Sequence, residues 1–121
     1  MNDLRQRTKD FALRIIKMYT KLPKTSEAQV MGKQVLRSGT SVAANYREAC
    51  RARSKAEFKA KMGIVEQELD ETELWLELLV ESGIVAVDKM KDLLCETDEL
   101  LRIVVSSINT TKKGRDQRKA K

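Results

Sequence analysis

The chain has 121 residues, a length that suits a single domain. One Pro and five Gly leave little turn chemistry, whereas charged residues make up 35% of the chain. This composition is typical of long helices and argues against an all-β chain with its many turns.

The formal net charge is +6, but the charge is unevenly distributed along the chain. Lys and Arg outnumber Asp and Glu by 6 to 2 in residues 25–55, and the ratio reverses to 2 against 8 in residues 56–85. Residues 112–121 are basic again, with 6 against 1. This pattern indicates either a nucleic-acid surface on the basic segments, or basic and acidic faces that meet inside the fold or between subunits.

Apolar residues recur at steps of three and four in four successive segments, which predicts helices over about 3–20, 26–50, 55–81 and 86–111. Pro23 ends the first, because proline disfavours helical geometry in the residue before it. The predicted stripe of the first helix is Leu4, Phe11, Ile15, Met18 and Leu22, and that of the second is Ala28, Met31, Val35, Val42, Tyr46 and Ala49.

The second segment is expected to begin at Ser26, with Gln29 completing a capping box. Ser38-Gly39-Thr40 lies in its middle and lowers helix propensity, by about 1 kcal/mol at the glycine. The apolar stripe keeps its phase across this point. We therefore expect one continuous helix, with a close backbone approach at the small residues.

The third segment has the most regular stripe and the clearest ends. Ser54 and Glu57 form a capping box before it, and Gly83 fits the position after a helix where a left-handed residue is needed. The stripe of the third helix is Phe58, Met62, Val65, Leu69, Thr72, Leu76 and Leu79; that of the fourth is Met90, Leu94, Thr97, Leu101, Val104 and Ile108.

Long helices joined by short connections pack antiparallel to their neighbours, and sustained three-four spacing favours a shallow crossing angle. The predicted fold class is therefore all-α, a single-domain, antiparallel up-down four-helix bundle over residues 1–111. Residues 112–121 are expected to form a basic, disordered tail.

The side-chain inventory offers little chemistry. The chain has no histidine, the usual general base and commonest metal ligand, and no Gly-rich phosphate loop. Carboxylates such as Glu68 and Glu71 could pair, but dimetal bundles combine Glu with a Glu-x-x-His pattern. We expect no enzymatic activity, cofactor or metal. Cys50 and Cys95 lack metal-ligand spacing and are expected to be reduced thiols.

No apolar run approaches the roughly 18 residues of a spanning helix, and the first residues lack the apolar stretch and small-residue cleavage site of a signal peptide. The protein is therefore expected in the cytoplasm and not in a membrane.

Five apolar residues fall outside the core stripes: Leu13, Ile16, Ile64, Trp75 and Leu78. Because a monomeric bundle needs only one apolar face per helix, these residues predict an interface between copies of the chain. The alternative is that they are scattered exposed apolar residues, which monomers commonly carry.

Basic residues cluster on the second helix opposite Val35 and Val42, just after it, and in the tail. The candidate surface for RNA or DNA comprises Lys33, Arg37, Arg47, Arg51, Arg53, Lys55, Lys112, Lys113, Arg115, Arg118 and Lys119. Such a surface binds phosphates with strong salt dependence and little sequence preference. No aromatic residues are interleaved with it for base stacking. The alternative is a solvated face, or one that pairs with the acidic third helix of another subunit.

Residues 37–49 (RSGTSVAANYREA), followed by Arg51, Arg53, Ser54, Glu57 and Phe58, resemble the bacterial four helix bundle protein family. Its members include proteins encoded in intervening sequences of large-subunit ribosomal RNA genes. Residues 68–76 (ELDETELWL) continue the resemblance, which covers residues 4–112. Many members have Pro where Ala43 stands, and Ala-Glu-Gly in place of residues 47–49, so this chain resembles a variant branch.

The resemblance implies a bundle that assembles into a ring, expected to be a pentamer, without enzymatic activity. It also implies a distant similarity to the basic accessory protein of diversity-generating retroelements, which binds nucleic acid and a reverse transcriptase. Asn45, Glu48, Glu68 and Glu71 match the polar positions of the family. We expect them to be structural, because polar groups within a bundle can fix helix register, although a site is the alternative.

The predicted function is that of a non-enzymatic, homo-oligomeric helical scaffold that binds RNA or another nucleic acid through its basic face. The alternative is a protein–protein adaptor whose charges serve self-assembly only.

Overall fold

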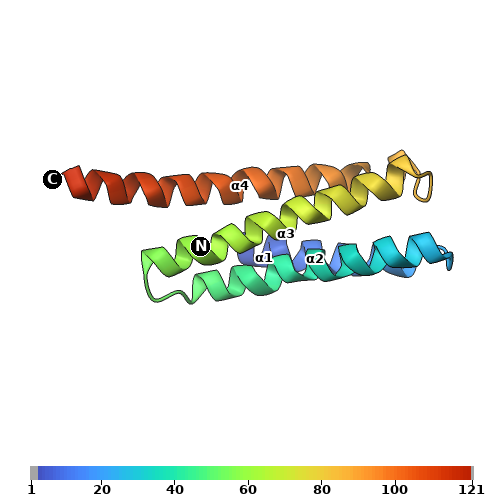
Figure 1. The fold of residues 1–121 in the computed structure, drawn as a ribbon, viewed down its shortest axis with the longest axis horizontal. Coiled ribbons are helices and arrows are strands. Elements are labelled where there is room, and N and C mark those ends of the chain that lie inside the picture. Colours follow the sequence, from blue (N-terminus) through green and yellow to red (C-terminus); the bar gives the residue numbers. More distant parts are fainter. Residues whose placement is uncertain (1–2, 121) are drawn as a thin grey trace.

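The computed structural model describes residues 3–120, and for residues 112–120 it describes the backbone alone. The described chain has four helices and no strand: α1 (Asp3–Thr20), α2 (Ser26–Cys50), α3 (Lys55–Glu81) and α4 (Val87–Ala120). Successive helices run antiparallel and pack into a single bundle (Figure 1). The prediction of an all-α four-helix bundle is confirmed.

Ion pairs show the register of α2 against α3. Arg37 in α2 pairs with Glu71, whereas Glu48, later in α2, pairs with Lys61, earlier in α3. The order of the partners reverses, as it must between antiparallel helices. Each helix packs along its neighbour in sequence, but α1 and α4 contact one another far less.

The sparse contact between α1 and α4 includes a cluster of charges. Arg7 Nη2 lies 2.7 Å from Glu96 Oε1 and 3.2 Å from Glu99 Oε1. The hydrogen bond to Glu96 is the main reason that the pKa of Arg7 is raised. The side of the bundle between α1 and α4 is therefore held partly by charge and is its most open side.

Most predicted helix ends agree with the structure. Ser54 caps α3 by accepting a hydrogen bond of 3.0 Å from the Glu57 backbone N–H, and Gly83 has a positive φ of 82° after α3. The predicted cap of α2 was wrong by one residue. Thr25, in extended conformation, caps the helix, and the side chain of Gln29 donates to the Pro23 carbonyl instead of closing a capping box.

α2 is continuous through Ser38, Gly39 and Thr40, as predicted. A Cβ atom built on Gly39 would lie 2.8 Å from Ile15 Cγ1, so the missing side chain lets α1 approach closely. The close backbone approach predicted at this point is confirmed.

The core follows the predicted stripes of α1, α2 and α3 closely, and differs in α4. Leu93 and Leu100 are buried, whereas their predicted counterparts Leu94 and Leu101 are only half-buried. Because α4 has two pairs of adjacent leucines, spacing alone could not select the inner member of each pair. The fully buried side chains of the core include Phe11, Ile15, Val35, Val42, Met62, Val65, Leu69, Leu76, Leu79, Met90, Leu100 and Val104.

α4 continues to Ala120, beyond the end near 111 that we predicted. Lys, Arg and Gln are good helix formers, and no proline interrupts residues 112–120. The side chains of residues 112–121, and with them the predicted basic tail, lie outside the described residues.

Candidate nucleic-acid interface

The connection between α2 and α3, residues 51–54, lies beside the second half of α4. Arg53, Ser54 and Lys55 line a pocket of about 480 Å³ together with Thr110 and Thr111. These two threonines directly precede Lys112 and the basic segment 112–121. The fold therefore places the basic α2–α3 connection beside the α4 residues that immediately precede a second basic segment of the sequence.

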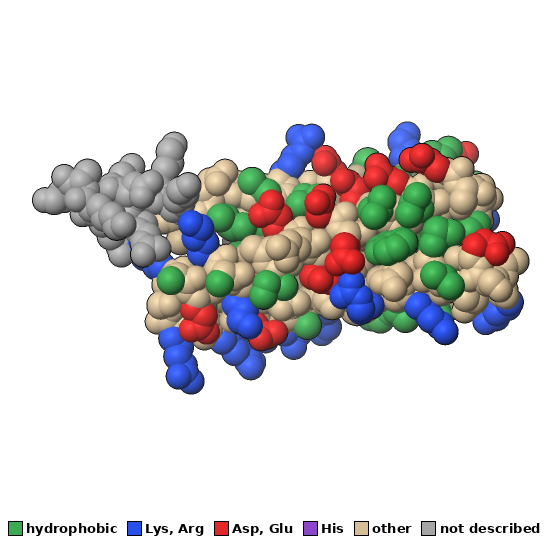
Figure 2. Space-filling model, in the orientation of Figure 1, with side chains coloured by type: hydrophobic (Ala, Val, Ile, Leu, Met, Phe, Trp, Pro, Cys, Tyr) green, Lys and Arg blue, Asp and Glu red, His purple; other side chains and the backbone are tan. Residues whose placement is uncertain are grey.

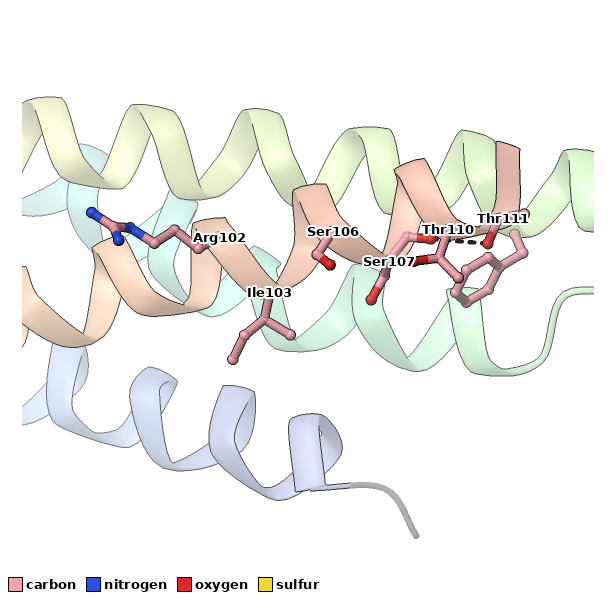
Figure 3. Close-up of a pocket in the computed structure, with 7 residues that line it drawn as sticks. Arg102, Ile103, Ser106, Ser107, Thr110 and Thr111 are labelled. Atoms are coloured by element: carbon pink, nitrogen blue, oxygen red, sulfur yellow. Dashed lines mark hydrogen bonds between the residues drawn. The ribbon is translucent and has the colours of Figure 1, made fainter. Parts of the chain in front are cut away.

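A second pocket of about 530 Å³ extends this region along α4. It shares Phe58, Thr110 and Thr111 with the first pocket and adds a row of α4 side chains, Arg102, Ile103, Ser106 and Ser107 (Figure 3). The Thr111 hydroxyl donates to the Ser107 carbonyl at 2.9 Å. Sequence analysis missed the hydroxyl groups of α4, because only the fold places them next to the predicted cations. They belong to Ser106, Ser107, Thr110 and Thr111.

The described cations of this end are exposed and unpaired. Arg47 lies on the outer face of α2, opposite buried Val35 and Val42, and Arg51, Arg53 and Lys55 follow at the connection. Lys33 lies on the same outer face but near the start of α2, at the opposite end of the bundle. In the part of the chain that the structure describes, none of these five side chains forms an ion pair. Their charges are free to meet phosphate groups.

Arg37 behaves differently from the other predicted cations. Its guanidinium lies 3.2 Å from Glu68 Oε2 and 3.0 Å from Glu71 Oε1. The hydrogen bond to Glu71, followed by the charge of Glu68, raises the pKa of Arg37. Two carboxylates already neutralise this side chain, so it ties α2 to α3 and offers little charge to a phosphate.

The four polar residues of the family resemblance all lie on or near the α2–α3 contact. Glu68 and Glu71 hold Arg37, and Glu48 Oε1 lies 2.9 Å from Lys61 Nζ. Asn45 Nδ2 donates to the Ser41 carbonyl at 2.9 Å within α2. Three of the four therefore act as ties between helices in this structure.

Four of the five residues predicted for an oligomer interface are exposed: Leu13, Ile16, Ile64 and Leu78. Trp75 differs, because its side chain is half-buried and packs against the core. Its indole is wide enough to reach from the edge of α3 to the interior, and Nε1 is buried without a hydrogen-bond partner among the described residues. Sequence analysis missed Val30 and Leu74, which are also large, apolar and exposed.

The two signs of charge are unevenly distributed over the bundle. On the face shown in Figure 2, most acidic side chains lie over α3 and α4 and most Lys and Arg side chains lie along the edge of α1 and α2, with a few of each sign on the other side. Burial, and then the charges of Glu77, Asp98 and Asp70, raise the pKa of Glu73. Carboxylates therefore repel one another along the α3–α4 contact, away from the basic end.

The described residues contain neither a membrane-spanning helix nor a metal-ligand cluster. No helix that they form combines the length and apolar character needed to cross a bilayer. Within residues 3–111, no three side chains of His, Cys, Asp or Glu are arranged to hold a metal ion. Neither Cys50 nor Cys95 forms a disulfide bond in the part of the chain that the structure describes.

A model of the 23S rRNA-intervening sequence protein family matches residues 2–106. The chain belongs to this family. It is also similar to a crystal structure of a protein of unknown function from the S23 ribosomal protein family of Bacteroides thetaiotaomicron VPI-5482, with 38% identity and a TM-score of 0.81. The similarity covers 86% of this chain and 96% of that chain. No curated protein matches the chain.

The family match covers only part of the basic end. It includes Arg47, Arg51, Arg53 and Lys55, but it stops at residue 106, before Thr110 and the basic segment. The family pattern thus accounts for the bundle and the α2–α3 connection, whereas the last part of α4 is a feature of this chain beyond the match.

Proposed function

We propose that this protein is a cytoplasmic, non-enzymatic, homo-oligomeric scaffold that binds RNA or another nucleic acid through its basic end. The basic end comprises Arg47, Arg51, Arg53 and Lys55 together with the segment of α4 from residue 112. The observation that carries the proposal is the pocket that Arg53 and Lys55 share with Thr110 and Thr111, immediately before that segment.

Exposed cations without ion-pair partners are the groups that displace counterions from a phosphate backbone. Hydroxyl groups such as those of Ser54, Thr110 and Thr111 commonly donate hydrogen bonds to phosphate oxygens. Such contacts fix the position of a backbone and carry no base information. Binding at the basic end is therefore expected to tolerate different sequences. The name of the family refers to an intervening sequence of 23S rRNA, so RNA is the first nucleic acid to test.

The experiment is a salt titration of RNA binding. Fluorescence anisotropy with a labelled generic RNA should show that the logarithm of the association constant falls linearly with the logarithm of salt concentration, with a slope of about −0.7 to −0.9 for each phosphate contacted. A chain that shows no binding at low ionic strength would rule the proposal out.

Self-association is the second part of the proposal. One edge of α3, beside its contact with α2, carries Ile64, Trp75 and Leu78. Glu68 and Glu71, which pair with Arg37 of α2, lie on the same edge. Hydrophobic side chains gather over the carboxyl-terminal half of α3 on this face (Figure 2). An apolar edge of this kind supports contact between copies of the chain, and a ring of five remains the expected form.

The separation of charge favours one rival function. An acidic α3–α4 side and basic residues on α1 and α2 could meet between copies, so that the protein would be an adaptor whose charges serve assembly only. Light scattering and RNA binding, both measured at rising salt concentration, distinguish the adaptor from the scaffold. In the adaptor, salt dissociates the oligomer and RNA does not bind; in the scaffold, RNA is released while the oligomer persists.

A further inference from the structure

A pocket of about 900 Å³ opens at the end of the bundle opposite the basic end. It lies where the α1–α2 and α3–α4 turns come together, beside the start of α4 (Figure 1). The pocket exists because α1 and α4 contact one another so little. Its volume is within the range of about 300 to 1,000 Å³ that is usual for small-molecule sites.

The floor of this pocket is apolar. Leu22 and Leu93 are buried in it, and Met18, Ile84 and Val85 are half-buried around them. The α3–α4 turn carries apolar residues where polar ones are usual. Its left-handed glycine turns the chain back, so that the Val85 N–H donates to the Leu79 carbonyl at 3.0 Å. The turn thus supplies an apolar wall.

The rim of the pocket is cationic. Arg14 and Lys17 lie on the side of α1 that also carries Arg7, which pairs with α4, and Lys21 follows just after the helix. Lys89 completes the rim from the first turn of α4. All four are exposed, and within residues 3–111 none of them forms an ion pair.

The rim includes a single acidic residue against these cations, Asp92. The first N–H groups of α4 also point toward this end, and Ala86 before the helix has no side-chain oxygen to cap them. Four cations against one carboxylate leave a net positive charge around the apolar floor, and a bound anion would offset it. The apolar floor in turn selects an anion that carries a hydrocarbon body.

We propose that this pocket binds a small amphipathic organic anion, a carboxylate or phosphate monoester with an apolar chain. The apolar body lies on Leu22, Leu93 and Val85, and the head group meets Lys17, Lys21 and Lys89. The site is independent of RNA binding, because it lies at the other end of the bundle and a polynucleotide has no hydrocarbon chain to place on its floor.

Isothermal titration of the full chain tests the proposal with four probes: octanoate, octyl phosphate, 1-octanol and inorganic phosphate. Octanoate and octyl phosphate identify the preferred head group. The neutral alcohol lacks the charge, and inorganic phosphate lacks the apolar body. We expect both of these to bind at least about tenfold more weakly than the better octyl anion, since each lacks one of the two contributions.

Variants locate the site. Lys17→Gln combined with Lys21→Gln should weaken binding of the better octyl anion by about tenfold, because two attractive charges are lost. The matched control, Lys9→Gln combined with Lys91→Gln, removes the same charge from exposed positions that do not line the pocket and should leave affinity unchanged. Circular dichroism checks that both variants remain helical.

The proposal is overturned if neither octyl anion binds, if octanol binds as tightly as they do, or if the two variants behave alike. A fully folded chain that binds RNA but none of the four probes would refute this site and leave the basic end intact.

Discussion

Thr72 Oγ1 lies 2.8 Å from Ser38 Oγ, and the hydrogen bond between these two buried hydroxyls joins α3 to α2. Both side chains are fully buried, and Thr72 Oγ1 also lies 2.7 Å from the Glu68 carbonyl. A slip of one helix along the other would leave these hydroxyls facing apolar side chains. The pair therefore opposes alternative registers of α2 against α3.

Thr72→Val should lower the free energy of unfolding by about 1 to 3 kcal/mol, because it removes one partner and leaves the Ser38 hydroxyl buried with only the long 3.4 Å contact to the Val35 carbonyl. The double variant Thr72→Val with Ser38→Ala should recover part of this loss. Urea unfolding followed by circular dichroism gives both values. Strictly additive losses would show that the two hydroxyls do not interact.

Gly39→Ala should destabilise the bundle by about 1 to 3 kcal/mol, although alanine is the better helix former. The new Cβ would lie 2.8 Å from Ile15 Cγ1 and 3.0 Å from Ile15 Cγ2, so α1 must move. The control is Gly63→Ala in α3, where a Cβ meets nothing within 4 Å. That change should stabilise the protein by up to about 1 kcal/mol. Thermal unfolding compares the two, and equal effects would contradict the close approach.

Glu73→Gln should raise the free energy of unfolding near neutral pH, by at most about 0.5 kcal/mol, because it removes a charge that partial burial disfavours and that Glu77, one turn away, repels. The pKa of Glu73 is higher in the folded protein than in the unfolded chain. The wild type therefore gains stability as the pH falls through the folded-state pKa, and the gain is complete below the unfolded-state pKa. The advantage of the variant should shrink over that interval. Urea unfolding at a series of pH values measures it; a constant advantage would contradict the assignment.

Arg51→Glu combined with Arg53→Glu should weaken RNA binding by more than about tenfold and reduce the salt slope by about two, because two phosphate contacts are lost. Arg37→Gln is the matched comparison, since Glu68 and Glu71 already neutralise Arg37. It should change RNA affinity much less and lower stability instead. If Arg37→Gln affects RNA binding as strongly as the double variant, Arg37 contacts the nucleic acid directly.

Ile64→Glu combined with Leu78→Glu should convert the oligomer into smaller species, because charges would be buried at the apolar edge of α3. Val87→Glu changes an apolar residue at the start of α4 that is more exposed, at 59% against 38% for Ile64 and Leu78, and should leave the oligomer intact. Light scattering of both variants and of the wild type measures the mass. A wild type that is a monomer at all concentrations would remove the basis for this interface.

The predicted helices and their ends agree with the structure where the signal is local. Ser54, Gly83 and the regular stripe from Met62 to Leu79 act through neighbours a few residues away, so their roles are visible in the sequence. The choice of Leu93 over Leu94 is different, because adjacent leucines fit the same spacing. Only the position of α3 against α4 decides which one is buried.

The sequence by itself determined four amphipathic helices, their burial stripes and the separation of basic from acidic segments, since helical periodicity and capping depend on residues within one or two turns. The tertiary structure alone decided that Arg37 is neutralised by α3, that Trp75 turns inward, and that Arg53 lies beside Thr110. These relationships join residues that are distant in the chain, and they depend on which faces the packed helices turn toward one another.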